Sequence, residues 1–303
     1  MIAQAGRRKA LLSALPEIYF LHHPCLRLST LDQYARATRS FCRFCGRDIP
    51  VGSISKMDVL AWMQQRLKEA SPRTVKRERG DLLTLWRFAW AEGMHNINPD
   101  TLRIPTVRCP RKSPTAWHLD QLQSWIEAAG RLAGNVRGTD IRKADWWQAY
   151  GLFLYCTAAR PSAARLVRKK DIDLERGIVV LRAEVSKTGH DDVCRLNKQA
   201  IDAIRKIYDP ESEYIFPWPY HEDVLWRHFK RISEQAGLPT DRYHSLGCMR
   251  RTAASLTAAH GSVEMARQLL GHSSPDITLR HYIDPRIAYQ RSAVDVLPRL
   301  EIG

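Results

Sequence analysis

The sequence predicts a mainly α-helical protein with one small antiparallel β-sheet, divided into two domains. Apolar residues recur at helical spacing over most of the chain, whereas residues 177–196 read as a strand, a turn and a returning strand. With 303 residues, 44% of them hydrophobic, the chain can bury two cores. We therefore expect a helical domain at residues 1–104, a linker at residues 105–115 and a mixed domain at residues 116–303.

Three or four amphipathic helices account for the N-terminal domain, and three of them can be placed. The first follows an N-cap at Ser29 or Thr30, because hydroxyl side chains accept hydrogen bonds from the free N–H groups at a helix start. Ser55 introduces the second helix, over residues 57–70, and the third covers residues 72–92 and stops at a glycine. Short links between the helices favour a small bundle.

The third helix begins with a dense group of basic side chains: Arg73, Lys76, Arg77 and Arg79. Positive charge in the first turns of a helix opposes the helix dipole, so these residues do not serve helix stability. Contact with the phosphate groups of a nucleic acid is the interpretation that we prefer to a merely solvated face.

The second domain is expected to begin after a linker. Residues 105–115 are rich in proline and basic residues and lack apolar periodicity, which is typical of a linker. A helix then runs from Leu119 to about Leu132, and residues 147–157 are apolar enough to form a buried helix.

The charge of the chain favours a polyanionic partner. Lys and Arg number 47 against 32 acidic residues, which gives a formal net charge of +15 and a pI near 9.7. Nucleic acid is the first candidate for such a partner, and a positive surface that only aids solubility is the alternative. The first 110 residues hold 18 basic and 9 acidic residues, so the N-terminal part is proportionally the more basic.

The sequence predicts neither a membrane span nor a secretion signal. No run of about 18 apolar residues occurs. The basic N-terminus is followed by an apolar stretch that Pro16 and Glu17 interrupt, which makes a poor signal peptide. The seven scattered cysteines fit a reducing cytoplasm.

One pair of cysteines has metal-ligand spacing. Cys42 and Cys45 could form a zinc site with the upstream residues His22, His23 and Cys25. The two thiols also suit the buried face of the first helix, and there is no second Cys-x-x-Cys pair. We therefore expect no metal.

The most informative pattern lies near the C-terminus, in residues 268–282. The sequence Gln-Leu-Leu-Gly-His-Ser-Ser-Pro-Asp-Ile-Thr-Leu-Arg-His-Tyr places a Gly-His-Ser turn between two helical stretches and ends on a tyrosine. It resembles the end of the active site in the tyrosine recombinases, the phage integrase family. In that family the tyrosine attacks a DNA phosphate and the histidine hydrogen-bonds the same phosphate. The resemblance implies these roles for Tyr282 and His272.

An upstream segment resembles the first arginine motif of the family. The sequence Thr-Ala-Ala-Arg-Pro-Ser-Ala-Ala-Arg-Leu identifies Arg160 as the first catalytic arginine, and a guanidinium can hold two phosphate oxygens at once. Arg165 is the competing local arginine. The chain departs from the family pattern at Ala158, where glycine is usual, and at Ala163, where an acidic residue usually supports the site.

Two further residues complete the resemblance. The Lys-Thr-Gly sequence at the tip of the predicted hairpin implies that Lys187 is the general acid that protonates the leaving 5′ oxygen, with an ordinary surface lysine as the alternative. The sequence Met-Arg-Arg-Thr-Ala-Ala resembles the second arginine motif, in which Arg250 would bind the phosphate.

The histidine that normally precedes the second arginine by three residues is missing, because that position is Gly247. The nearest histidine is His244, six residues before Arg250, and a continuous helix would turn the two side chains apart. His244 could act as the base only if residues 244–248 form a loop. Loss of this group is the alternative.

The tyrosine is also shifted by one residue relative to the family. The usual spacing of nine residues after the histidine leads to His281, and Tyr282 follows it. Tyr289 is a distant second choice for the nucleophile, and a purely structural role for Tyr282 is the alternative.

The resemblance implies a function and a domain arrangement. Residues 1–104 would be a core-binding domain that clamps DNA, and residues 116–303 would be the catalytic domain. The expected activity is that of a site-specific DNA recombinase, or integrase, which cleaves and rejoins DNA through a 3′-phosphotyrosyl intermediate. The resemblance implies a reaction that is independent of metal ions. No nucleotide cofactor is required, because the covalent link keeps the energy of the phosphodiester bond. Double-stranded DNA is the expected partner, with a homo-tetramer on two recombination sites, no membrane and a cytoplasmic, nucleoid-associated location.

Other functions remain open from the sequence alone. A degenerate relative of the family could bind DNA with little or no cleavage, as the changes at Ala163 and Gly247 and the shifted tyrosine would allow. A basic DNA-binding regulator with coincidental motifs is a second alternative. A type IB topoisomerase, which shares the chemistry, is a third.

Overall fold

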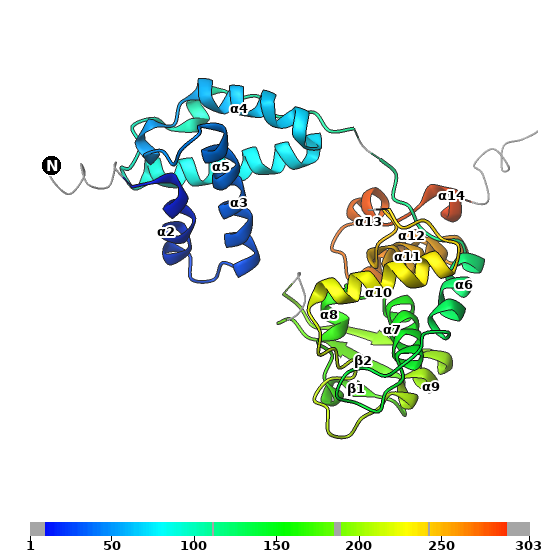
Figure 1. Ribbon diagram of the computed structural model, residues 1–303. Coiled ribbons are helices and arrows are strands. Elements are labelled where there is room, and N and C mark those ends of the chain that lie inside the picture. The colour runs from blue at the N-terminus through cyan, green and yellow to red at the C-terminus, as the bar shows by residue number, and fades with distance from the viewer. Residues whose placement is uncertain (1–9, 111, 185–188, 242, 290–303) are drawn as a thin grey trace, which may run out of the picture. The chain divides into compact units, whose positions relative to one another are not determined.

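The computed structural model describes residues 10–110, 112–184, 189–241 and 243–289, and the chain forms two compact units (Figure 1). The first unit comprises Met1–Arg111 and the second comprises Lys112–Gly303. The division falls within the stretch that we expected to be a linker. Helices dominate both units, and the described strands form one three-stranded antiparallel sheet, which confirms the predicted fold class.

The first unit is a helical bundle built around a long helix. Its elements are η1 (Leu12–Ala14), α2 (Leu15–His22), α3 (Leu28–Phe44), η2 (Val51–Ser53), α4 (Lys56–Glu69), α5 (Pro72–Ala91) and η3 (Pro99–Leu102). Helix α5 packs against α2, α3, α4 and η3, and it buries aromatic and aliphatic side chains against each of them. Its basic first turns therefore have a fixed backbone position within this unit.

The helix starts in this unit follow the predicted capping chemistry in part. The side chain of Ser55 accepts a hydrogen bond from a backbone N–H group at the start of α4, as predicted. Ser71 caps α5 in the same way, which had not been predicted. The prediction for α3 was wrong, because that helix starts at Leu28 after Arg27, and neither predicted hydroxyl residue is its cap. Helix α2 was not anticipated, and Leu15 at its start is fully buried in the core of the unit.

The second unit combines ten of the described helical segments with the sheet. Its elements are α6 (Leu119–Ala129), α7 (Lys143–Thr157), α8 (Pro161–Arg165), η4 (Lys169–Asp171), β1 (Ile172–Asp173), β2 (Ile178–Leu181), β3 (Asp192–Arg195), α9 (Lys198–Lys206), α10 (Glu222–Gln235), α11 (Gly247–His260), α12 (Val263–Leu270), α13 (Pro275–His281) and α14 (Pro285–Ala288). The sheet order is β1-β2-β3, and Val179 pairs with Cys194 across the predicted hairpin.

Helix α7 is the centre of the second unit and packs against α6, α9 and α11. Its residues Trp146, Trp147, Tyr150 and Phe153 are fully buried, in a cluster that includes tryptophans from neighbouring segments. Burial of such large apolar surfaces is the main stabilising contribution in a domain of this size. The end of α7 is thereby fixed, and the first arginine motif follows directly after it.

No helix among the residues that the structure describes is both long enough and apolar enough to cross a lipid bilayer.

Candidate active site

Four of the residues singled out from the sequence come from four segments of the second unit. Arg160 precedes α8, Arg250 lies on α11, His272 follows α12, and Tyr282 is the C-cap of α13. Three of them are in mutual contact, and the fourth is electrostatically coupled to that group, as described below. Lys187 lies outside the residues that the structure describes.

The turn that carries Arg160 depends on a left-handed residue. Helix α7 ends at Thr157, and its C-cap residue Ala158 has φ 47° and ψ 25°, a conformation that costs a residue with a β-carbon roughly 1–2 kcal/mol. The hydroxyl of Thr157 supports the turn by donating to the Phe153 carbonyl (2.7 Å) and accepting from the Ala159 N–H (3.2 Å). Glycine would avoid the strain, which explains why the family pattern has glycine at position 158.

Arg250 is a buried cation at the centre of the site. Only 6% of the residue is exposed, and its guanidinium donates to the carbonyl oxygens of Ala158 and Leu270, the latter at 2.7 Å. Burial lowers its pKa, but an arginine keeps its charge in the physiological range. Its Nε atom is buried and has no hydrogen-bond partner within the described part of the chain. The Nε–H group is therefore a donor that is left for an anionic ligand.

His272 lies against this guanidinium. It follows Gly271, whose φ of 63° ends α12 in the left-handed conformation. Its Nε2 atom is 3.3 Å from Arg250 Nη2, and its Nδ1 atom is 2.9 Å from the hydroxyl of Thr278. Burial, followed by the charges of Arg250 and Arg160, lowers the pKa of His272 to about 4. The ring is therefore neutral at physiological pH.

Tyr282 completes the group. Its ring centre is 4.7 Å from that of His272, and the Cζ atom of Arg250 is 5.1 Å from the centre of the phenol ring. The backbone is held as well, since the Tyr282 N–H donates to the Thr278 carbonyl at 3.0 Å and Ser255 Oγ donates to the Tyr282 carbonyl at 3.3 Å. The phenol is thus fixed beside a cation and a neutral imidazole.

Arg160 is partly buried and is near enough to influence both neighbouring groups. Its charge adds to the effect of burial in lowering the pKa values of Arg250 and His272. Its guanidinium makes no hydrogen bond or ion pair with any residue that the structure describes. Two guanidinium groups close together, with donors to spare, form a binding site for an anion.

Two residues at the site had not been singled out from the sequence. Thr278 is fully buried and contacts both His272 and Tyr282. A β-carbon added to Gly271 would lie 2.9 Å from Asp192 Oδ1, so this carboxylate is directly against the Gly-His turn. Its charge raises the pKa of Arg250, against the larger effect of burial. The hairpin itself was predicted, but the contact of Asp192 with the Gly-His turn depends on tertiary packing, which no local sequence signal reveals.

The structure places His244 in a turn before α11, so residues 244–246 are not part of the helix. Its Nδ1 atom is 3.1 Å from Asp241 Oδ1. No hydrogen bond connects its ring to Arg250, His272 or Tyr282 among the residues that the structure describes. Residues 244–246 thus form part of the loop expected at residues 244–248, whereas Gly247 and Cys248 already belong to α11, and a role for His244 as a base remains a prediction.

Residues near the site residues in the sequence have other contacts or are exposed. Arg251 donates to the carbonyl oxygens of Thr115 (2.7 Å) and Tyr243, so its guanidinium ties α11 to two flanking segments. Tyr289 is 53% exposed, and its ring contacts none of the site residues in the described part of the chain. His281, at the usual tyrosine position of the family, is exposed.

The basic residues of α5 divide into two kinds. Arg73, Lys76 and Arg77 are exposed, as a phosphate-binding face requires. Arg79 is partly buried and donates to the Ile104 carbonyl, and burial lowers its pKa. Arg79 therefore also has a structural role within the first unit.

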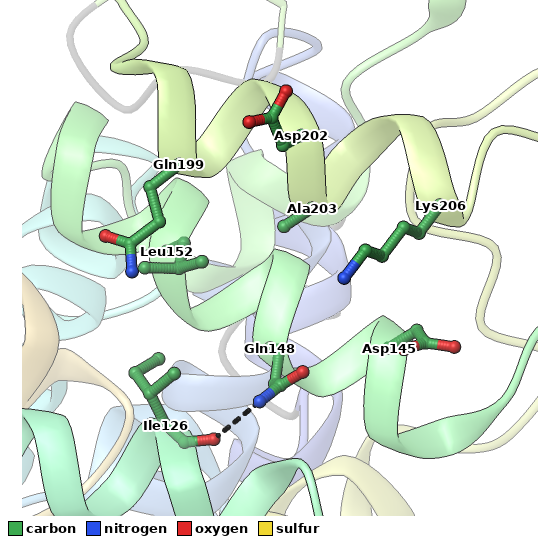
Figure 2. Close-up of a pocket in the computed structure, with 8 residues that line it drawn as sticks. All are labelled: Ile126, Asp145, Gln148, Leu152, Gln199, Asp202, Ala203 and Lys206. Atoms are coloured by element: carbon green, nitrogen blue, oxygen red, sulfur yellow. Dashed lines mark hydrogen bonds between the residues drawn. The ribbon is translucent and has the colours of Figure 1, made fainter.

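A cavity elsewhere in the second unit contains none of these residues. It holds about 230 Å³ between α6, α7 and α9 and is lined by Ile126, Asp145, Gln148, Leu152, Gln199, Asp202, Ala203 and Lys206 (Figure 2). Gln148 Nε2 donates to the Ile126 carbonyl across its wall at 3.2 Å. The lining residues include both acidic and basic side chains, and they belong to helices that pack against each other. We therefore assign no ligand to this cavity.

The cysteine pair in the first unit has local partners. The Cys42 thiol donates to Asp48 Oδ1 at 3.3 Å, and the ring of His23 stacks on Tyr19 with centres 3.9 Å apart. Burial raises the pKa of Cys42 to about 12, which disfavours the thiolate that zinc requires. The described residues contain no group of three or more His, Cys, Asp or Glu side chains arranged for a metal ion.

The chain is similar to known proteins in sequence and in fold. Residues 139–288 match the model of the phage integrase family. A candidate tyrosine recombinase XerC of Pseudomonas syringae is 24% identical over 305 residues, and the alignment covers 93% of this chain and 63% of that protein. The chain thus spans less than two thirds of the length of this relative.

Two solved structures have a similar fold. A lambda integrase dimer bound to a COC′ core site has a TM-score of 0.71 at 19% identity, over 98% of this chain and 82% of that one. A lambda integrase tetramer bound to a Holliday junction has a TM-score of 0.68 at 20% identity, over 88% and 79% of the two chains. At these identities the likeness concerns the fold.

Replacing His272 by glutamine should remove a pH dependence of stability. Its pKa is about 4 in the folded chain and about 6.5 in an unfolded one, so the unfolded chain binds the proton more readily between these values. Stability therefore falls as the pH drops through this window. The wild type should lose about 3 kcal/mol of unfolding free energy from pH 6.5 to 4 that His272→Gln does not lose.

Urea unfolding at a series of pH values measures this difference. His260→Gln, at the exposed end of α11, is the matched control and should keep the wild-type pH dependence. If the unfolding free energy of wild type and of His272→Gln changed equally with pH, the burial of a neutral imidazole at position 272 would be contradicted.

Proposed function

We propose that the chain is a member of the phage integrase family of tyrosine recombinases, and that it is a site-specific DNA recombinase that cleaves and rejoins DNA through a 3′-phosphotyrosyl intermediate. The observation that carries this proposal is the buried guanidinium of Arg250, which has an unpartnered Nε donor beside the ring of Tyr282. A nucleophile next to an unfilled anion site is what attack on a phosphodiester requires.

The reaction begins with attack by the phenol oxygen of Tyr282 on a DNA phosphorus atom. A bond forms between the tyrosine oxygen and phosphorus, and the bond from phosphorus to the 5′ oxygen breaks. The 3′ side of the DNA remains attached to the protein, and a free 5′ hydroxyl is released. Attack by a 5′ hydroxyl from a second duplex reverses the chemistry and joins the exchanged strands.

The two arginines have complementary roles in this reaction. Arg250 and Arg160 would bind the non-bridging phosphate oxygens, on which negative charge increases in the transition state. Arg250 is fixed by the carbonyl oxygens of Ala158 and Leu270, so little reorganisation is needed when the phosphate arrives. Lys187, which lies outside the described residues, is proposed as the acid that protonates the leaving 5′ oxygen.

The chemistry needs no energy-supplying cofactor, because the phosphotyrosyl bond keeps the energy of the phosphodiester. We also propose that no metal ion takes part, since two arginines, a lysine and a histidine supply the positive charge and the protons. A role for His244 as a base stays a prediction, which substitution of His244 would test.

Strand exchange between two DNA duplexes requires several active sites at once. We propose a homo-tetramer on two double-stranded recombination sites. The likeness to lambda integrase supports this, because that protein is seen as a dimer on a core site and as a tetramer on a Holliday junction. The proposal places the chain on nucleoid DNA in the cytoplasm.

The first unit is proposed to be the core-binding domain that clamps the duplex, within residues 1–104. Its support is the exposed basic face at the start of α5, formed by Arg73, Lys76 and Arg77. Residues 116–303 are proposed to be the catalytic domain, joined to it by the linker of residues 105–115.

Covalent attachment of DNA to Tyr282 is the central expectation. The chain should be incubated with duplex DNA from the flanks of its own gene and quenched in denaturant, and peptides should be examined by mass spectrometry. We expect a nucleotide on Tyr282 and its complete loss in Tyr282→Phe, because the phenol oxygen is the attacking atom.

Tyr289→Phe is the matched control for this experiment and should keep the adduct, since Tyr289 is exposed and away from Arg250. An adduct on Tyr289, or on no residue while the DNA is bound specifically, would overturn the proposed chemistry. The second result would identify the chain as a DNA-binding relative that does not cleave.

Removal of exposed charge from α5 should weaken DNA binding without unfolding the chain. Lys76→Gln removes one phosphate contact, so the slope of log affinity against log salt concentration should fall by about 1. Arg43→Gln, which removes an exposed charge from α3, is the control. It should change the affinity for DNA and the salt slope less than Lys76→Gln does. Binding measured by fluorescence anisotropy at several salt concentrations distinguishes the two, and equal effects would refute a specific phosphate-binding face on α5.

A further inference from the structure

Thr278 connects the two groups on which the proposed reaction depends. Its side chain is fully buried, and its hydroxyl oxygen lies 2.9 Å from Nδ1 of His272. Its backbone carbonyl accepts hydrogen bonds from the N–H groups of Tyr282, at 3.0 Å, and Ile283, at 3.2 Å. One residue therefore positions both the imidazole and the backbone of the nucleophile.

The other face of the imidazole determines where its proton lies. Nε2 of His272 is 3.3 Å from Nη2 of Arg250, and a guanidinium has only donors. A proton on Nε2 would place two N–H groups against each other, so Nε2 must present its lone pair. A neutral ring then carries its proton on Nδ1, and this N–H donates to the oxygen of Thr278.

We propose that Thr278 is a positioning residue that holds His272 with its proton on Nδ1, so that Nε2 accepts the phenol proton when Tyr282 attacks DNA. This role in proton transfer rests on the proposed recombinase function, whereas the position of the proton does not. It differs from the role that the family resemblance implies, in which the histidine only hydrogen-bonds the phosphate.

The proton transfer balances with the cleavage step. The O–H bond of Tyr282 breaks and an N–H bond forms on Nε2 of His272, which leaves the ring as an imidazolium. The tyrosine oxygen bonds to phosphorus while the bond to the 5′ oxygen breaks, and that oxygen takes a proton from Lys187. The imidazolium can then donate from Nε2 to a phosphate oxygen, and rejoining returns the proton to the phenol oxygen.

The charged groups around the ring keep it neutral in the free chain. Those that lower its pKa after burial come from every element packed around it: Arg250 on α11, Arg160 before α8, His281 on α13 and Arg267 on α12. Asp192 on β3 is the nearby carboxylate, and it lies against Gly271. A phosphate bound between the arginines would reduce their effect on His272 and make the ring more basic when the substrate is present.

Other candidates for the base are less well placed. The ring of His244 is engaged with Asp241 at 3.1 Å. His281 is exposed to solvent and lies at the end of α13. His272 has both a ring contact with Tyr282 and a partner that orients its second nitrogen.

The position of the proton can be measured in the free chain. Long-range ¹H–¹⁵N spectra of the full chain with ¹⁵N-labelled histidine distinguish a protonated ring nitrogen from an unprotonated one, and comparison with His272→Gln assigns the signals. At neutral pH we expect Nδ1 of His272 to be protonated and Nε2 to be unprotonated. The reverse pattern would overturn the proposal, whatever activity the chain has.

Two substitutions at position 278 separate the hydroxyl from the shape of the side chain. Thr278→Val keeps the shape and removes the acceptor, so the His272 proton should move toward Nε2. Thr278→Ser keeps the hydroxyl and should keep the wild-type pattern. A wild-type pattern in Thr278→Val, with the fold intact in the amide spectrum, would show that Thr278 does not determine the tautomer.

The rate of adduct formation on Tyr282 tests the catalytic part. Thr278→Val should slow it on the order of 10- to 100-fold, and Thr278→Ser should stay within about threefold of wild type. Equal rates in all three chains would refute the transfer to His272 while leaving the recombinase function intact. Absence of an adduct in all three, with the tautomer as expected, would overturn the function and with it the transfer.

Discussion

The candidate active site of this protein is organised by one buried cation. Arg250 is withdrawn from water and is held by carbonyl oxygens from the end of α7 and the end of α12, with the imidazole of His272 beside it. Burial of a charge without a compensating charge costs several kcal/mol, and neutral acceptors offset only part of this cost. An anion that accepts a hydrogen bond from the Nε–H group of Arg250 would offset the rest of this cost.

The backbone turns at the site place groups around the buried guanidinium of Arg250. Ala158 has a left-handed conformation that an alanine adopts only at a cost, and its carbonyl oxygen is an acceptor for Arg250. Gly271 adopts the same conformation without strain, and it leaves room for the carboxylate of Asp192. Two sharp helix ends thus surround the guanidinium, and each supports a residue with a proposed catalytic role.

Much of this could be predicted from the sequence, because the relevant signals are local. The helical periodicity, the single hairpin and the serine cap of α4 are properties of short segments, and the structure contains them all. The contacts among Arg250, His272 and Tyr282 agree with the order of motifs that suggested these residues. Their roles remain proposals.

Other features depend on tertiary packing and had no signal in the sequence. The hydroxyl of Thr278 gains its importance from the fold of the Gly-His turn, and Asp192 reaches the same turn only through the hairpin. Arg79 looked like one more basic residue of α5, but a carbonyl at Ile104 binds its guanidinium. The start of α3 at Leu28 was missed because Arg27, the residue before it, carries no recognisable capping side chain.

The most direct test of the central role of Arg250 is the NMR signal of its Nε–H group during titration with inorganic phosphate. A saturable change at Arg250 is expected, and it should weaken in Arg160→Ala because the second guanidinium is lost. Arg251 is the internal control, since its guanidinium is already engaged by Thr115 and Tyr243. An Arg250 signal that stays constant while other arginines respond would contradict an anion site at this position.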